Sequence, residues 1–350
     1  MPLGISVVVC CFNSAAKIAP TMAHLLNQKD IQSSSWELII VDNGSTDNTS
    51  EKATLIWQIF EGSKPKLKVV NESNPGLSFA RKRGIDESNF DFVLFCDDDN
   101  WLEENYLSVS LSIMQSSPYI GALGGTGFPV FEDKEPPYFW SNQFHALAVG
   151  MQSDIEGDIT DTRGVLYGAG MVLNKKAFRI LQEKYRFRFL LSDRIKGSLA
   201  SSGDHELCLA LRKIGYRIFY SKIMRFKHFI PAFRTTIRYY RKLFMAFGRS
   251  YALLHVYSVN KSNLNHFKND YRYICLRCLK NIFILETKLV LKGYYFQKER
   301  YKYVDLLHQL YSNIGVLRTF IKIKNLYREQ FFNHPLFSSD SIVVSGYATV

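Results

Sequence analysis

Apolar runs alternate with amphipathic stretches through the first hundred residues. Short runs rich in branched side chains cover residues 5–11, 36–41 and 67–70, and a fourth run opens residues 92–101. The runs at 5–11, 36–41 and 92–101 predict buried strands, and residues 67–70 predict a short strand. Between them, residues 17–28, 45–60 and 77–85 carry the spacing and capping residues of helices. Strands and helices that alternate in this way predict an α/β fold, with a doubly wound, mostly parallel sheet flanked by helices.

The pattern changes beyond residue 119. Residues 119–176 lose regular periodicity, an amphipathic helix then ends at Gly215, and residues 218–229 predict a further strand. From residue 235 to residue 334 the chain has helical spacing and is rich in Tyr, Phe, Arg and Lys. We therefore expect an α/β domain over residues 1–234, followed by a basic, aromatic-rich and mostly helical C-terminal region over residues 235–350.

Composition supports a globular chain. Hydrophobic residues make up 47% of the 350 residues and charged residues 22%. The first twelve residues lack a charged start and lead directly into a strand pattern, so we expect no signal peptide. The sequence contains no run of about 18 uncharged apolar residues, which predicts that no segment spans a membrane.

Charge is divided unevenly along the chain. Residues 1–221 hold 22 basic and 26 acidic side chains, whereas residues 222–350 hold 22 basic and 6 acidic ones. Basic and aromatic side chains on amphipathic helices suit an anionic membrane surface, which we expect as a partner. A solvated face of a packed helical subdomain or a dimer contact would give the same composition. Nucleic acid is not expected, because no nucleic-acid-binding motif accompanies the charge.

Three consecutive carboxylates, Asp97, Asp98 and Asp99, follow the fourth predicted strand. Like charges at this density repel one another unless a cation lies among them. Carboxylate oxygens are the ligands that Mg²⁺ and Mn²⁺ prefer, often together with the phosphates of a substrate. The alternative is a solvated acidic turn before a helix.

Other strand ends carry polar side chains as well. Asn13 follows the first strand and Asp42 ends the second. Because the carboxyl ends of parallel strands share one edge of the sheet, we expect these side chains and the three aspartates to line one crevice. Asn13 and Asp42 would also serve as plain turn or cap residues. The glycine-rich loops of dinucleotide-binding and P-loop proteins are missing.

Five sequence blocks in this order resemble glycosyltransferase family 2, the large inverting family with the GT-A fold, and its bacterial surface-polysaccharide members in particular. The blocks are V-V-V-C-C-F-N, I-I-V-D-N-G-S-T-D-N-T, G-L-S-F-A-R, L-F-C-D-D-D-N-W and G-D-H-E-L-C-L-A-L-R-K-I-G-Y. Their order and spacing agree with the family over residues 5–235. One block alone would be a weak signal, whereas five in order are specific.

The resemblance implies a set of residues that bind a nucleotide sugar. Phe12 and Asn13 would border the nucleobase, and Asp42 would hold the uracil or the ribose. Arg81 would approach the diphosphate. Asp97 would contact the ribose or the donor sugar, and Asp98 is assigned to the same binding set. Lys82 departs from the family, where many members carry Asn after the arginine, which leaves the details of the phosphate contacts open.

The resemblance also implies a metal site and a catalytic base. Asp99, the second aspartate of the D-x-D motif, would ligate Mn²⁺ or Mg²⁺, with His228 as a further ligand or a diphosphate contact. Asp204 would be the base that removes the proton of the acceptor hydroxyl. Many members carry Glu-Asp at this point, whereas this chain has Gly203-Asp204. Taken alone, Asp204 would also serve as a helix cap and His228 as a structural side chain.

We therefore expect an inverting, metal-assisted glycosyltransferase. It would use a nucleoside-diphosphate sugar, a UDP-sugar by preference, and a hydroxyl of a saccharide or lipid-linked acceptor. The expected location is cytoplasmic, peripheral on the inner face of the cell membrane. The alternatives are a catalytically inactive GT-A binding module and a sugar-nucleotidyltransferase. The second would need a glycine-rich basic loop after the first strand, and residues 11–14 are not one.

Overall fold

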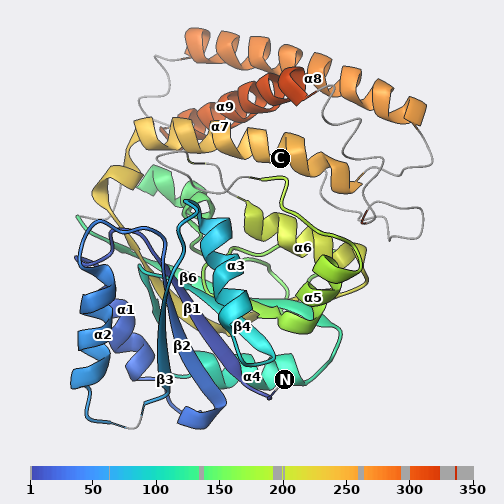
Figure 1. The fold of residues 1–350 in the computed structure, drawn as a ribbon. Helices are drawn as coiled ribbons and strands as arrows, with labels where there is room; N and C mark the ends of the chain where they lie inside the picture. Colours follow the sequence, from blue (N-terminus) through green and yellow to red (C-terminus); the bar gives the residue numbers. More distant parts are fainter. Residues whose placement is uncertain are drawn as a thin grey trace.

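The computed structural model describes residues 2–62, 64–133, 138–191, 199, 202–258, 264–292, 300–323 and 336. Its centre is a nine-stranded sheet with helices on both faces and a further layer of helices at one end (Figure 1). The predicted α/β class with flanking helices is confirmed.

The first half of the sheet has the predicted parallel arrangement. Strands β1 (Ile5–Cys11), β2 (Trp36–Asp42), β3 (Lys66–Asn71) and β4 (Phe92–Asp97) lie in the order β3-β2-β1-β4. Helices α1 (Ile18–Leu26), α2 (Thr49–Ile59) and α3 (Leu77–Glu87) connect them. Cys11 lies opposite Asp42, and Cys10 opposite Asp97. The carboxyl ends of β1, β2 and β4 are therefore level with one another.

The second half of the sheet is mixed. Strands β5 (Asn100–Leu102), β6 (Ile120–Phe131), β7 (Gly157–Asp158), β8 (Val172–Asn174) and β9 (Arg217–Ile230) complete it. β8 is antiparallel to both β4 and β6, and β9 is parallel to β6 but antiparallel to β5 and β7. The single strand predicted over residues 92–101 is wrong in one respect. A turn at Asp98 and Asp99 divides it, and β5 leaves β4 to pair with β9.

Alternate side chains of the central strands enter two cores. On β1, Val8 packs with residues of α3, α5 (Lys175–Glu183) and α6 (Gly203–Lys213). Its neighbours Val7 and Val9 pack on the other face with α1, α2 and α4 (Tyr106–Gln115). A strand with both faces covered is mostly apolar, which explains the hydrophobic runs in the sequence, and the buried Ser6 of β1 donates its hydroxyl to Glu37 of β2.

Three long helices form the C-terminal layer: α7 (Ile237–Leu254), α8 (Leu264–Lys292) and α9 (Arg300–Ile323). Figure 1 shows them stacked beside one end of the sheet, with α8 outermost. Leu254, Val256 and Tyr257 join the same core as α6, so this layer is packed onto the sheet domain. None of the described helices is long and apolar enough to cross a membrane.

Gly248→Ala is expected to destabilise the packing of α7 against α9. A Cβ atom at Gly248 would lie 2.0 Å from the backbone oxygen of Ser312 on α9, and one at Gly315 would lie 2.2 Å from the oxygen of Met245. A backbone atom cannot rotate away, so the overpacking, about 1–3 kcal/mol, should outweigh the better helix propensity of Ala, about 1 kcal/mol. Denaturant unfolding measures the difference, with exposed Lys242→Ala on α7 as the control. Equal stability of the Gly248 variant and the parent would contradict this packing.

Candidate active site

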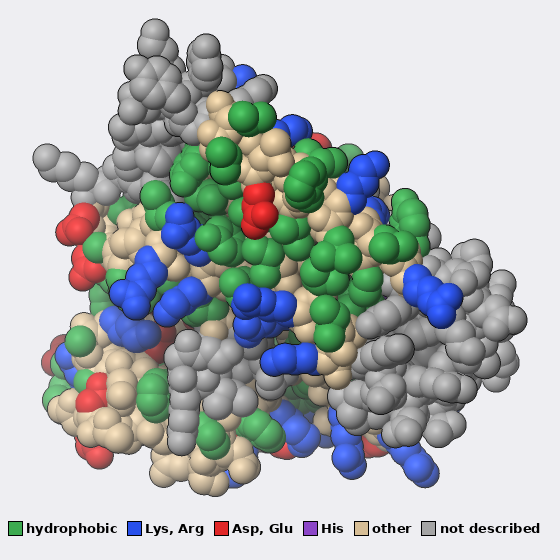
Figure 2. All heavy atoms as spheres, turned by 90° about the horizontal axis from the view of Figure 1, so that it is seen from above, with side chains coloured by type: hydrophobic (Ala, Val, Ile, Leu, Met, Phe, Trp, Pro, Cys, Tyr) green, Lys and Arg blue, Asp and Glu red, His purple; other side chains and the backbone are tan. Residues whose placement is uncertain are grey.

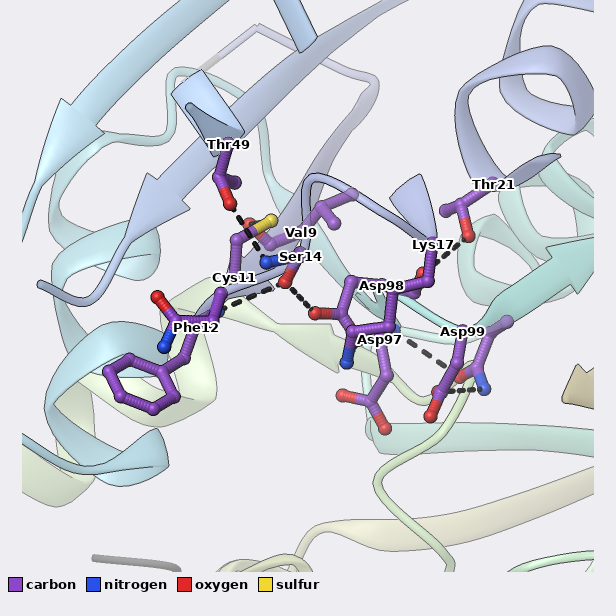
Figure 3. Close-up of polar contacts among 12 residues, drawn as sticks. Val9, Cys11, Phe12, Ser14, Lys17, Thr21, Thr49, Asp97, Asp98 and Asp99 are labelled. Carbon is purple, nitrogen blue, oxygen red and sulfur yellow. Dashed lines mark hydrogen bonds and ion pairs between the residues drawn. The ribbon is translucent and has the colours of Figure 1, made fainter. Parts of the chain in front are cut away.

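The three consecutive aspartates lie at the edge of the sheet where β1, β2 and β4 end, and their side chains point in three directions. Asp97 ends β4, and Asp98 and Asp99 form the turn before β5. Figure 3 shows Asp98 directed toward the loop after β1, with Asp97 and Asp99 turned away from it. Like charges are thereby separated, and each carboxylate has a different set of partners.

Asp99 is buried between two cationic or titratable side chains. Its carboxylate lies 3.5 Å from Nε2 of His228 and 3.4 Å from Nη1 of Arg234. The pairing of β5 with β9 brings His228 there, opposite Asn100. Burial by itself would raise the pKa of Asp99, but His228 and Arg234 outweigh it and hold the pKa well below its usual value. Asp99 is therefore a charged, anionic ligand group.

Asp99 and His228 fit a divalent cation. Both side chains are buried, and Nε2 of His228 lies 3.5 Å from the Asp99 carboxylate. A carboxylate oxygen and an imidazole nitrogen are suitable ligands for Mn²⁺. No group of three or more His, Cys, Asp and Glu side chains in the described part of the chain could hold a metal. A cation at this pair would thus depend on the phosphates of a substrate for its other ligands.

Asp98 anchors the loop that follows β1. Its carboxylate accepts a hydrogen bond from the Ser14 hydroxyl and pairs with Lys17 at 2.8 Å, while its carbonyl accepts from Thr21 at 2.9 Å. Burial and the nearby charge of Asp99 raise the pKa of Asp98 to about 6, with Lys17 opposing them. Lys17 was not singled out in the sequence, because nothing near it in the chain marks it as a partner for a carboxylate 81 residues further on.

Arg81 and Asp97 face each other across the carboxyl end of β4. Nη2 of Arg81, on α3, lies 3.6 Å from the Asp97 carboxylate, and its guanidinium lies 5.1 Å from the ring centre of Phe95. Asp97 keeps 31% of its side chain exposed, more than either neighbouring aspartate. The pair therefore offers a cation and a partly open carboxylate to a ligand.

Asp204 approaches the same arginine through Gly168. Its carboxylate accepts hydrogen bonds from the backbone N–H of Gly168 at 2.5 Å and of His205 at 2.9 Å. A Cβ atom at Gly168 would lie 2.5 Å from the Arg81 guanidinium, so a larger side chain there would displace the arginine. Arg81, Gly203 and Asp204 line one small cavity. A predicted base and a predicted phosphate contact, 123 residues apart in sequence, are thus brought together.

Asn13 and Asp42 organise the loop after β2. Asn13 has a positive φ of 50°, and its side-chain oxygen accepts from the Thr46 N–H at 2.8 Å. Asp42 accepts from the Ser45 N–H at 2.8 Å and from the Ser50 hydroxyl at 2.6 Å. These contacts agree with the turn and cap alternatives, and they also shape the corner where a nucleobase is expected. Phe12, beside this corner, is 59% exposed (Figure 3).

Glu206 ties helix α6 to the C-terminal layer. It is fully buried, and its carboxylate accepts from the backbone N–H groups of Leu190 and Leu191 at 2.8 and 3.0 Å. The Tyr257 hydroxyl donates to it at 3.1 Å. The sequence marked only an acidic helix start, and the partners of Glu206 come from segments that the local pattern does not connect.

The structure thus gathers the predicted residues in three groups. Asp99 lies with His228; Arg81 lies between Asp97 and Asp204; and Asn13 and Asp42 hold the loop next to Phe12. Asp98 belongs to none of them, since its carboxylate is bound to Ser14 and Lys17. Lys17, which the sequence did not single out, and the backbone of Gly168, in a small-residue segment that resembles one of the family beside the donor sugar, complete the site.

The described sheet and its flanking helices define a GT-A fold. A solved structure of similar architecture is the mannosyltransferase PcManGT from Pyrobaculum calidifontis in complex with GDP-Man and Mn²⁺. Its TM-score is 0.56 at 13% identity, with 93% of this chain and 87% of that one covered. At this identity the likeness concerns the fold alone.

The family follows from the sequence match. The model of glycosyl transferase family 2 matches residues 6–181, just over half of the chain, so the chain belongs to this family. Among curated proteins, it is 31% identical over 107 residues to a cholesterol galactosyltransferase of Borreliella burgdorferi, covering 30% of this chain and 27% of the relative. It is 29% identical over 131 residues to a poly-beta-1,6-N-acetyl-D-glucosamine synthase of Staphylococcus aureus, covering 37% and 30%. The matched segments thus span less than a third of each relative.

Proposed function

We propose that the chain is an inverting glycosyltransferase. It transfers a sugar from a nucleoside-diphosphate sugar, a UDP-sugar by preference, to a hydroxyl of a saccharide or lipid-linked acceptor. The observation that carries this proposal is the position of Arg81 between Asp97 at the end of β4 and Asp204 at the start of α6. Membership of glycosyl transferase family 2 supports it.

The donor binds along the carboxyl ends of β1, β2 and β4. Phe12, Asn13 and Asp42 border the nucleobase and ribose, and Asp97 faces the ribose or the donor sugar. Arg81 offsets the negative charge of the diphosphate, which grows as the bond to the sugar breaks. Asp98 contributes indirectly by holding the loop that contains Asn13, through Ser14.

Asp204 acts as the base of the reaction. The acceptor oxygen forms a bond to the anomeric carbon while the bond from that carbon to the diphosphate oxygen breaks, and the hydroxyl proton moves to the Asp204 carboxylate. Attack from the side opposite the leaving group inverts the anomeric centre. The backbone N–H groups of Gly168 and His205 donate hydrogen bonds to the Asp204 carboxylate and fix its orientation before an acceptor binds.

Asp99 and His228 would hold Mn²⁺ or Mg²⁺. When bound, such a cation supplies Lewis-acid stabilisation of the leaving nucleoside diphosphate. His228 and Arg234 lower the pKa of Asp99, which keeps this ligand group ionised.

The two parts of the chain have different roles in this proposal. Residues 1–234 carry the nucleotide-sugar chemistry, and residues 235–350 place the enzyme against an anionic surface, on the cytoplasmic side of a membrane. The charge asymmetry supports this, with 22 basic and 6 acidic side chains beyond residue 221.

Nucleotide sugars are expected to stabilise the chain only in the presence of a divalent cation. A thermal-shift panel of UDP-, GDP- and dTDP-sugars, each with Mn²⁺ and with EDTA, measures this. At about 100 times Kd, a ligand stabilises the folded state by roughly 2.7 kcal/mol. A metal-dependent shift with one nucleotide class, followed by release of that nucleotide on addition of acceptor, supports the transferase. A shift without any turnover would favour a binding module, and no shift from a folded protein would contradict the donor site itself.

A further inference from the structure

The outer helix α8 presents an apolar face to the surroundings of the protein. Seven large side chains between residues 273 and 291 are exposed, among them Phe283 at 73% and Val290 at 82%. The full set is Tyr273, Leu276, Leu279, Phe283, Ile284, Val290 and Leu291, which we call the α8 face. Seven exposed large hydrophobic residues on one helix are more than the scattered single ones of an ordinary surface, and such patches mark interaction sites.

The α8 face is the side of the helix that faces away from the protein. Ile274, Cys278 and Leu285 are buried, and they follow one another at intervals that keep them on one side of a helix. At about 100° per residue, the members of the α8 face lie on the opposite side. The helix is therefore apolar on two sides, although only one of them packs against the chain.

Basic side chains lie within the α8 face and along one side of it. Arg272, Arg277, Lys280 and Lys288 are exposed on the same helix, where the described side chains include one acidic residue, Glu286. Over the described side chains of α7, α8 and α9 there are 11 basic and 2 acidic residues. Figure 2 looks down on this end of the molecule and shows hydrophobic side chains gathered between groups of Lys and Arg.

We propose that the α8 face inserts into the interface of an anionic lipid bilayer, with its basic residues at the headgroups. An exposed apolar helix face with Lys and Arg among and beside its apolar side chains suits a helix that lies in the plane of an anionic membrane surface. A second copy of this chain is a poorer occupant, because pairing two such faces would bring like charges together. Each basic residue near an anionic surface strengthens binding about five-fold, or roughly 1 kcal/mol.

This proposal deepens the proposed place at a membrane by naming the surface that makes contact. It also connects to the site, since α7 begins three residues after Arg234, which contacts Asp99. An enzyme held by α8 would keep its crevice near the bilayer, where a lipid-linked acceptor is found. Vesicle binding and nucleotide binding are separate measurements, so one proposal can fail without the other.

Flotation with lipid vesicles tests the proposal on the full chain. We expect binding to phosphatidylcholine vesicles that contain about 30 mol% phosphatidylglycerol, and little binding to neutral ones. The double variant Phe283→Ser/Val290→Ser is expected to lower vesicle affinity at least roughly ten-fold, because two apolar side chains no longer insert. Both positions are exposed, so folding should be unaffected. The matched control is Leu55→Ser/Ile59→Ser, which removes two exposed apolar side chains from α2.

Substitutions that remove positive charge distinguish the contribution of electrostatic attraction to vesicle binding from that of apolar insertion. Arg277→Gln/Lys280→Gln should weaken binding and reduce its dependence on salt, whereas Phe283→Ser/Val290→Ser should leave the salt dependence unchanged. All variants should keep the thermal shift produced by UDP with Mn²⁺. Equal vesicle binding by the parent and the Phe283/Val290 variant would overturn the proposal. Failure of the parent to bind anionic vesicles would also overturn it. So would oligomers of the parent that the Phe283/Val290 variant no longer forms.

Discussion

Asp204→Asn is expected to lower the rate of sugar transfer by about 10²–10⁴-fold, the usual contribution of a positioned base. The amide cannot take the proton of the acceptor hydroxyl. It can still accept one of the two backbone hydrogen bonds that Gly168 and His205 donate to Asp204. The helix start should therefore persist, and the loss should lie in the chemical step.

Nucleotide release in the presence of acceptor measures the rate, and the thermal shift with UDP and Mn²⁺ measures donor binding. Asp204→Asn should change the first and leave the second within about two-fold, since the base acts on the acceptor. Asp161→Asn, which changes an exposed carboxylate that pairs with surface Arg217 at 3.4 Å, is the matched control. A variant at position 204 that keeps a third or more of the parent rate would exclude Asp204 as the base.

The sequence was sufficient for the part of the fold that depends on local pattern. The hydrophobic runs at β1, β2 and β4 are separated by helical spacing, so burial on both faces could be inferred from each run alone, whereas β3, which carries Lys66 and Lys68, is only partly buried. The convergence of Asn13, Asp42 and Asp97 followed from the rule that parallel strands end at one edge. The observed register, with Cys11 opposite Asp42, agrees with that rule.

Partners set by tertiary contacts could not be predicted. Three consecutive aspartates carry the same local signal, yet Asp97 meets Arg81, Asp98 meets Lys17, and Asp99 meets His228. Their directions depend on where the chain turns after β4 and on the antiparallel pairing of β5 with β9, which joins segments about 125 residues apart. Periodicity reports burial within an element and carries no information about such pairings.

Asp99→Asn is expected to abolish the metal-dependent stabilisation by nucleotide sugars. Asparagine has the size and shape of the parent side chain but lacks its negative charge, which His228 and Arg234 both contact. A divalent cation held by one carboxylate and one imidazole loses its only anionic protein ligand, so the roughly 2.7 kcal/mol of stabilisation at about 100 times Kd should disappear, and EDTA should have no further effect.

The charge on Asp99 also contributes to folding, so the variant needs a control for lost stability. Asp158→Asn removes a more exposed ion pair away from the site, since Asp158 lies 2.6 Å from Arg217 at the start of β9. Each variant is compared with and without Mn²⁺ and UDP, so that the ligand-dependent shift is separated from the shift in the free protein. Asp158→Asn should keep the full shift and Asp99→Asn none. If Asp99→Asn keeps it, the cation is held elsewhere, and Asp99 serves to position Arg234 and His228.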